Sequence, residues 1–357
     1  MTHVPEARLR VDDFDYDLPT QAIAQVPAEP RDASRLLVLD RAASRAGQPA
    51  LDAAHFADVG RWLRPGDLLV VNDSRVLRAR FHGRRPGGGA AEVLLLRPLP
   101  DGRWEALVRP AGRLRPGSTV RLATDDVLVI GEAVGEGTRA VALPRDAGAL
   151  MAAAGEMPLP PYITSHAAPD DRYQTVYAEP PGSAAAPTAG LHFTPRLLDE
   201  LGQTGIGRAT VTLHVGLDTF RPLERTYVDE HHIHREWYAV PDGTRLAIAQ
   251  VKAGGGRVVA VGTTTTRVLE TLARTGQSEG WTDLYITPPH RYRSVDVLIT
   301  NFHLPRSSLL LLVTAFVRDG MPDTSPLAAR DVLLAAYRAA LEAEFRFYSF
   351  GDAMLIQ

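Results

Sequence analysis

The fold of this chain is decided by residues 257–267, RVVAVGTTTTR. The apolar run predicts a buried strand, and the glycine and threonines behind it predict a turn into a helix. In an open α/β sheet, ligands bind beyond the carboxyl ends of the strands, close to helix N-termini. The stretch therefore predicts an α/β sheet and a loop that offers hydroxyl and backbone donors. The alternative for Thr266 is a plain helix N-cap.

Segments of the same kind recur on both sides of this stretch. Buried-type strands are expected at 36–39, 67–71, 209–213, 237–240 and 295–300. Helices are expected at 21–25, 56–63, 195–201, 243–253, 266–274, 306–318 and 328–344. Strands that alternate with helices favour an α/β domain.

Between residues 75 and 155 the pattern changes to short strands. They are expected at 93–96, 104–108, 119–122, 127–130 and 139–143, with turn signals between them. Such spacing predicts a small β-barrel or sandwich. Strands of the α/β pattern occur before and after this segment. The predicted fold class is therefore an α/β main domain (residues 1–74 and 156–357) with an inserted small all-β, barrel-like domain (residues 75–155).

Composition narrows the function classes. The chain has 357 residues, which suggests two domains, and its 45% hydrophobic and 23% charged residues are typical of a globular enzyme. It has no cysteine, which excludes disulfides, thiolate catalysis and cysteine-ligated metals. The N-terminus lacks a charged-then-apolar leader, and the longest apolar run, 309–317, is too short to span a bilayer. A cytoplasmic protein without membrane contact is expected.

Charge is distributed unevenly along the chain. Residues 75–121 hold 11 arginines against three acids, a net charge of +8 within a chain of net charge −3. A basic segment on an acidic chain can attract a polyanion such as RNA. The alternative is an ordinary β-rich surface in a chain that uses arginine in place of lysine almost everywhere.

A run of small residues, 182–194, is a candidate binding loop. It contains Thr188, Gly190 and His192, and it ends in the helix-start signal Thr194-Pro195. Small residues let a ligand approach backbone N–H groups, and the helix behind them favours an anionic group. The alternative is a tight connection packed on a core.

Two predicted strands end in histidine next to other polar residues. His214 and Asp218 follow strand 209–213, and Asn301, His303 and Arg306 follow strand 295–300. His214 and Asp218 can act as base and orienter, or shape a pocket for a cation. Asn301, His303 and Arg306 suit recognition of a carboxylate or the edge of a nucleobase. The alternatives are a core histidine, a turn aspartate, and helix caps at Asn301 and Ser307.

Several familiar site patterns are absent from the sequence. Three histidines lie within 230–236, but neighbouring histidines diverge on a strand or a helix and no further ligand set follows, so no metal is expected. No P-loop, dinucleotide fingerprint or Gly-x-Ser-x-Gly elbow occurs. NAD enzymes, P-loop ATPases and α/β-hydrolases are therefore disfavoured.

Ten strings spread over nearly the whole chain resemble one known family. They are FDYDLP (14–19), RDASR (31–35), NDSRV (72–76), PLPPYI (158–163), RYQTVYA (172–178), APTAGLHFT (186–194), LHVG (213–216), GTT (262–264), ITNFHLP (299–305) and FYSFGDAM (347–354). Through them the chain resembles the S-adenosylmethionine:tRNA ribosyltransferase-isomerases of queuosine biosynthesis. The departures are mild: Ala184, Thr265-Thr266 and the loop 288–292 differ from the usual family residues.

The resemblance implies an unusual reaction. The ribosyl part of S-adenosylmethionine is transferred to the aminomethyl group of 7-aminomethyl-7-deazaguanine at the tRNA wobble position. Its ring rearranges to give epoxyqueuosine tRNA, and adenine and methionine are released. S-adenosylmethionine is consumed as a substrate, so no cofactor is expected. The partners are S-adenosylmethionine and the precursor tRNA, and a monomer is expected. Two other classes remain open: an RNA-binding protein without catalysis, and a nucleoside-processing hydrolase.

The residues singled out above are the candidates for roles in this reaction. The reaction is expected to begin with removal of a proton next to the sulfonium. His192 is favoured as the base, with His214 and His303 behind it; the alternative for His192 is to orient its loop. A neutral imidazole is required, so activity should rise with pH through about 6.5. Substrate binding is assigned to Thr188, Gly190, Asp218, Gly262, Thr263, Thr264, Asn301 and Arg306. Contact with tRNA is assigned to Arg75, Arg84 and Arg85.

Overall fold

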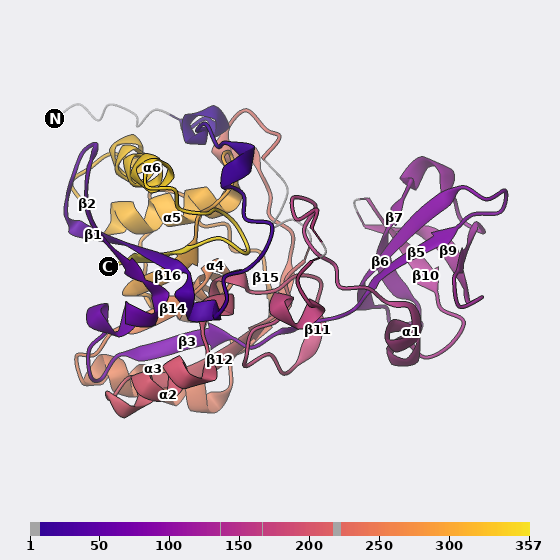
Figure 1. Cartoon of the computed structure of the whole chain (residues 1–357), viewed down its shortest axis with the longest axis horizontal. Helices are drawn as coiled ribbons and strands as arrows, with labels where there is room; N and C mark the ends of the chain where they lie inside the picture. Colours follow the sequence, from indigo (N-terminus) through magenta and orange to yellow (C-terminus); the bar gives the residue numbers. More distant parts are fainter. Residues whose placement is uncertain (1–7, 136, 166, 217–222) are drawn as a thin grey trace.

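The computed structural model describes residues 8–135, 137–165, 167–216 and 223–357. Figure 1 shows two lobes, a larger one built on a mixed sheet and a smaller β-barrel beside it. The expected α/β main domain with an inserted all-β barrel is confirmed.

Within the described residues, nine strands form the main sheet. In spatial order they are β15 (Glu279–Thr282), β13 (Glu236–Ala239), β12 (Gly207–Leu213), β3 (Leu68–Asn72), β14 (Val258–Val261), β16 (Val297–Asn301), β17 (Ala353–Ile356), β1 (Arg35–Arg45) and β2 (Gln48–His55). The central strands β12, β3, β14 and β16 are parallel to one another. Their carboxyl ends therefore meet at one edge of the sheet, where the polar loops follow.

Helices cover both faces of this sheet. Successive strand residues point to opposite sides, so alternate residues of β3 pack into two different cores. Leu68 and Val70 pack into one apolar core with side chains of α3 (Asp242–Ala253), α4 (Thr263–Thr275), α5 (Ser308–Asp319) and α6 (Pro326–Glu342). Leu69 and Val71 pack into a second core with α2 (Pro195–Gln203) and the 3₁₀ segment Phe56–Trp62. A strand buried on both faces reads as a continuous apolar run, which is why the sequence reveals it.

The helix ends differ from expectation at several places. Helix α4 begins at Thr263 with Gly262 as its N-cap, at φ of +90°. Thr266 is therefore no cap; its hydroxyl donates to the Gly262 carbonyl at 3.0 Å. The segments expected as helices at 21–25 and 56–63 are 3₁₀ turns at 20–22 and 56–62. Thr194 and Ser307 do cap α2 and α5, each accepting a backbone N–H.

Six strands, all within the described residues, close into the barrel. They are β5 (Arg80–Arg84), β6 (Ala90–Pro98), β7 (Trp104–Arg109), β8 (Thr119–Leu122), β9 (Val127–Gly135) and β10 (Thr138–Ala142). The helix α1 (Ala147–Ala154), which the sequence did not predict, packs Leu150 and Met151 into the barrel core. A short parallel pair, β4 (Arg75–Val76) and β11 (Pro181–Ser183), lies beside the junction of the lobes. In the part of the chain that the structure describes, no helix is long and apolar enough to cross a membrane.

Candidate active site

Two cavities adjoin at the carboxyl ends of the central strands. The smaller, about 60 Å³, lies among the loops after β14 and β16, and we term it the strand-end cavity. The larger, about 930 Å³, lies between the main sheet and the barrel, and we term it the interdomain cleft. Val215, Thr263, Thr264 and Leu309 line both. A ligand can therefore extend from one cavity into the other.

The strand-end cavity brings together five of the eight residues predicted to bind substrate, together with the candidate base His303. The five are Thr188, Gly262, Thr263, Thr264 and Asn301. They meet because α4 and α5 both begin beside it. Helix α4 follows β14 after Gly262, and α5 follows β16 after the loop 302–307. The Thr188 hydroxyl donates to Asn301 Oδ1 at 3.3 Å, which ties two of the loops together. Helix N-termini supply free N–H groups and a positive end, so this corner suits an anionic group.

His192 lies beneath this cavity and lines neither cavity. Its Nε2 accepts a hydrogen bond from Asn301 Nδ2 at 3.2 Å, and its Nδ1 lies 2.7 Å from Ser34 Oγ. The ring stacks on Phe56. Burial, with Arg346 and Arg31 nearby, lowers the pKa of His192 to about 3. Both ring nitrogens are thus engaged, and this geometry favours the role of orienting Asn301 over that of a base.

His303 is also buried, but it lines the strand-end cavity. Its Nε2 lies 2.8 Å from Thr300 Oγ1, and its backbone N–H donates to the Tyr337 hydroxyl at 3.1 Å. Burial lowers the pKa of His303 to about 3. The imidazole is therefore neutral at ordinary pH.

His214 faces the interdomain cleft. Its Nδ1 lies 2.8 Å from Ser74 Oγ, and its ring stacks on Trp237 at 5.2 Å between centroids. No hydrogen-bond partner of Nε2 occurs among the described residues. A Cβ at Gly182 would lie 2.5 Å from Nε2, so glycine there keeps this nitrogen uncovered. Burial lowers the pKa of His214. A fixed, neutral imidazole with one open nitrogen is the arrangement that a general base needs.

Two predicted substrate-binding residues line neither cavity. Gly190 is buried against the Tyr177 hydroxyl, which leaves no room for a side chain. Arg306 is exposed at φ of +52°, with its Nε 3.7 Å from Asp15. These contacts give Gly190 and Arg306 structural explanations. Asp218 lies outside the described residues.

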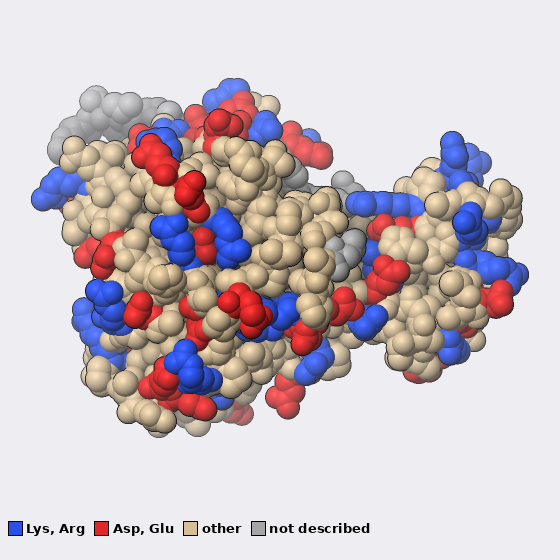
Figure 2. Space-filling model, viewed as in Figure 1, with Lys and Arg blue, Asp and Glu red and all other residues tan. Residues whose placement is uncertain are grey.

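None of the three arginines predicted to contact tRNA lines the cleft. Arg75 donates through Nη2 to the Ala178 carbonyl, beside the β4–β11 pair. Arg84 is exposed and donates to Gly88 O at 3.0 Å, and Arg85 packs against Gly89. Figure 2 shows basic side chains along the outer rim of the barrel lobe, with fewer acidic ones. The basic segment therefore forms part of an exposed surface of the barrel.

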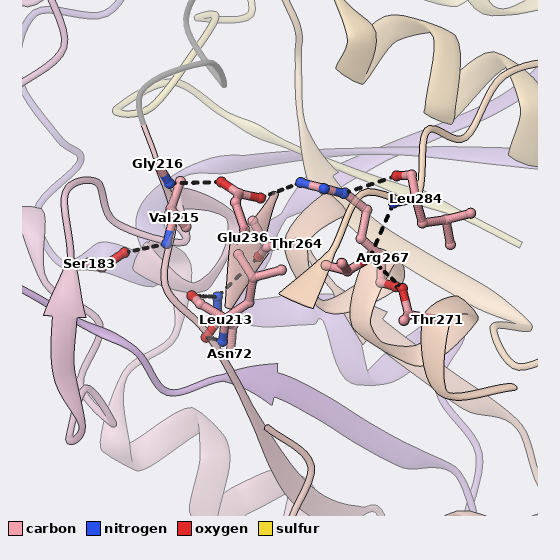
Figure 3. A network of polar contacts seen from close by, with 11 residues as sticks. Asn72, Ser183, Leu213, Val215, Gly216, Glu236, Thr264, Arg267, Thr271 and Leu284 are labelled. Carbon is pink, nitrogen blue, oxygen red and sulfur yellow. Dashed lines mark hydrogen bonds and ion pairs between the residues drawn. The ribbon is translucent and has the colours of Figure 1, made fainter. Parts of the chain in front are cut away.

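A buried ion pair in the cleft wall was missed by sequence reasoning. Arg267 donates through Nη1 to Glu236 Oε2 and through Nε to the Leu284 carbonyl at 3.2 Å, while Gly216 N–H donates to Glu236 Oε1 at 2.7 Å (Figure 3). Arg267 lies one helical turn after Thr263, which was a signal that it shares the same edge. Its partner Glu236 is distant in sequence and gave no signal.

Aromatic residues at the cavities were missed as well. Trp104, Trp237 and Trp281 line the interdomain cleft, and Tyr348 lines the strand-end cavity. Tyr348 is only 5% exposed and sits at φ of +70°, and its hydroxyl has no partner among the described residues.

Metal ligation finds no support in the geometry. Among the described residues, no group of three or more His, Cys, Asp or Glu side chains is placed to hold an ion. His231, His232 and His234 belong to these described residues.

Comparison with known proteins places the chain in one family. The family model described as queuosine biosynthesis protein matches residues 11–356. The S-adenosylmethionine:tRNA ribosyltransferase-isomerases of Moorella thermoacetica and Symbiobacterium thermophilum are 49% and 48% identical to this chain. Each match covers 98% of this chain and 100% of the relative. A crystal structure of an S-adenosylmethionine tRNA ribosyltransferase from Thermotoga maritima shares 37% identity at a TM-score of 0.54, covering 97% of this chain and 100% of that one. The chain therefore belongs to the family of queuosine biosynthesis proteins that includes the S-adenosylmethionine:tRNA ribosyltransferase-isomerases.

Proposed function

We propose that this protein is an S-adenosylmethionine:tRNA ribosyltransferase-isomerase. It transfers the ribosyl part of S-adenosylmethionine to 7-aminomethyl-7-deazaguanine at the tRNA wobble position, rearranges the ring, and releases adenine and methionine. The product is epoxyqueuosine tRNA. The observation that carries the proposal is the pair of adjoining cavities, since a transfer between two substrates needs two sites that share a boundary.

The strand-end cavity suits the methionyl end of S-adenosylmethionine. The N-termini of α4 and α5 both lie beside it, and the Tyr348 hydroxyl there lacks a partner among the described residues. Backbone N–H groups and a hydroxyl are donors for a carboxylate. Thr188, Gly262, Thr263, Thr264 and Asn301 belong to this site in the proposal, and Asp218 remains a candidate for the ammonium or the ribose hydroxyls.

His214 is the proposed base, with His303 and His192 as residues that position the strand-end loops. The carbon next to the sulfonium is a very weak acid in water, so its proton needs a close base in a preorganised site. His214 presents an open Nε2 to the cleft, whereas His192 uses both ring nitrogens within the fold. Ser74 holds His214 at Nδ1, and stacking on Trp237 fixes the plane of its ring.

The tRNA is proposed to lie across the barrel rim and the mouth of the interdomain cleft, with Arg84, Arg85 and Arg75 near its phosphates. The residue limits of the main domain, 1–74 and 156–357, and of the insertion, 75–155, belong to the proposal. So do a monomeric state and a cytoplasmic location.

One incubation separates this function from its alternatives. Adenine is measured after mixing the protein with S-adenosylmethionine and tRNA that carries the precursor base. Adenine release that depends on this tRNA is expected. Release without tRNA would favour a nucleoside hydrolase, and tRNA binding without any release would favour an RNA-binding protein.

A further inference from the structure

One buried guanidinium in the cleft wall has a donor that the fold does not use. Arg267 is 5% exposed, and its Nη1 and Nε are occupied by Glu236 and the Leu284 carbonyl. Its Nη2 has no hydrogen-bond partner among the described residues. Because a buried donor without a partner is costly, such a group in a cavity wall calls for a ligand acceptor. Nη2 is shielded from solvent, so the guanidinium has to turn toward the cleft to use it.

The neighbouring carboxylate decides which acceptor fits. Glu236 is 7% exposed and pairs directly with Arg267, so the positive charge is already compensated. A second carboxylate would add an uncompensated negative charge to a buried neutral pair. A neutral carbonyl oxygen, by contrast, gains the free N–H at no charge cost. The pair therefore favours a carbonyl acceptor.

The surroundings of Arg267 favour a flat, aromatic ligand. Trp237 and Trp281 lie directly opposite each other on β13 and β15, and Trp281 is 43% exposed. The Arg97 guanidinium of the barrel lies 5.1 Å from the centroid of the Trp281 ring. Aromatic side chains of this kind bind unstacked nucleobases. A cleft that large can hold a flipped nucleoside as well as part of a small substrate.

We propose that Arg267 recognises the 6-carbonyl oxygen of the guanine-type wobble base while that base stacks on the tryptophan wall. A 7-deazaguanine lacks the ring nitrogen that arginine also contacts in guanine, so the 6-carbonyl oxygen is the acceptor that remains on this edge for the unpartnered Nη2. Adenine presents an amino group at the same place and leaves Arg267 unpaired. This assignment rests on the function proposed above, because it takes the cleft as the site of the tRNA base.

The test changes the base and leaves the wild-type protein intact. Anticodon stem-loops carry guanine, inosine or 2-aminopurine at the wobble position. Inosine keeps the carbonyl and lacks the amino group, and 2-aminopurine does the reverse. Stem-loop binding is followed by tryptophan fluorescence. We expect inosine to bind within about threefold of guanine and 2-aminopurine to bind about 10–100-fold more weakly. Equal binding of guanine and 2-aminopurine would overturn the proposal.

Two variants then assign the discrimination to Arg267. In R267K the guanine preference should fall to within about threefold, because lysine lacks the planar fork. The matched control is R257K, at the opposite end of β14, where Arg257 pairs with buried Asp67 at 2.7 Å. R257K should keep the full preference. An R267K protein that keeps the preference but loses S-adenosylmethionine affinity would assign Arg267 to the methionyl carboxylate and overturn the proposal.

Folding and overall function are checked separately. If R267K fails to melt cooperatively, R267Q replaces it, since a glutamine amide can still donate to Glu236. Adenine release by the wild type on precursor tRNA reports whether the proposed function holds. If adenine is released but the three stem-loops bind equally, only the role of Arg267 is rejected and the proposed function stands.

Discussion

The strand-end cavity and the interdomain cleft differ in how they are built. Loops of one domain form the first, among them those that follow β14 and β16, and its walls carry hydroxyl, amide and backbone groups. Two domains form the second, and its walls carry tryptophans and a buried ion pair. The first suits a small charged group and the second suits a nucleobase. The difference shows that local sequence motifs mark only those sites that local chain geometry creates.

The histidines give the largest expected effect and the sharpest way to break this comparison. His214 faces the cleft, whereas His192 lies beneath the strand-end cavity. We expect H214Q to slow single-turnover adenine release by about 100–10,000-fold while both substrates still bind. H192Q should slow it much less and lower the thermal midpoint, since it disturbs Asn301. If adenine release is lost in H192Q and stays near the wild-type rate in H214Q, His192 is the base.

Acid should destabilise the protein through the two buried histidines on the strand-end side, His192 and His303. The folded-state pKa values of His192 and His303 are about 3, below the unfolded value of about 6.5. Their contribution to stability is therefore present above pH 6.5 and is lost as pH falls from there toward 3. The free energy of unfolding should fall by about 1 kcal/mol or more per pH unit in that window. Denaturant unfolding at several pH values measures it.

H303Q sharpens this test. It removes one of the two buried imidazoles and should therefore reduce the pH slope of the free energy of unfolding. The pH profile of kcat/KM is a second test. Because the pKa of His214 is lowered, kcat/KM should rise below pH 6.5 and not at the ordinary histidine value expected from sequence. A rise centred above 6.5 would argue against His214 as the base.

Thr263 tests where the two cavities meet. T263V keeps the shape of the side chain and removes the hydroxyl, and it should weaken S-adenosylmethionine binding by about tenfold. T266V is the matched control, because that hydroxyl is used inside the helix and lines neither cavity. Isothermal titration gives both affinities. Equal affinities in the two variants would remove Thr263 from the ligand contacts.

The barrel rim should give the smallest effect. R84A/R85A should weaken tRNA binding several-fold and flatten its salt dependence by roughly one to two in log–log slope, with S-adenosylmethionine affinity little changed. R196A, an exposed arginine of the main domain, is the control. If the salt slope changes in R196A and stays constant in R84A/R85A, the tRNA binds to the main domain and not to the barrel rim.

Most of the fold could be predicted because its signals are local. Continuous apolar runs marked β3, β14 and β16, and Thr194 and Ser307 marked two helix starts. Edge strand β2 was missed because its QPALDAAH sequence lacks a buried face. Strand β17 was missed because its AMLI sequence has a single β-branched residue. Helix α4 was placed three residues late because its first turn is made of threonines, which have low helix propensity.

The sequence alone determined the fold class, the resemblance to one family and the polar strand-end loops, because each depends on residues that are neighbours in the chain. Only the tertiary structure decided which histidine has an open nitrogen. His192 sits in the loop most typical of a site, yet Ser34 and Asn301, 158 and 109 positions away, engage its ring. Long-range packing likewise joined Glu236 to Arg267 and closed the cleft with the barrel. Those contacts depend on strand order and domain placement, which local patterns do not encode.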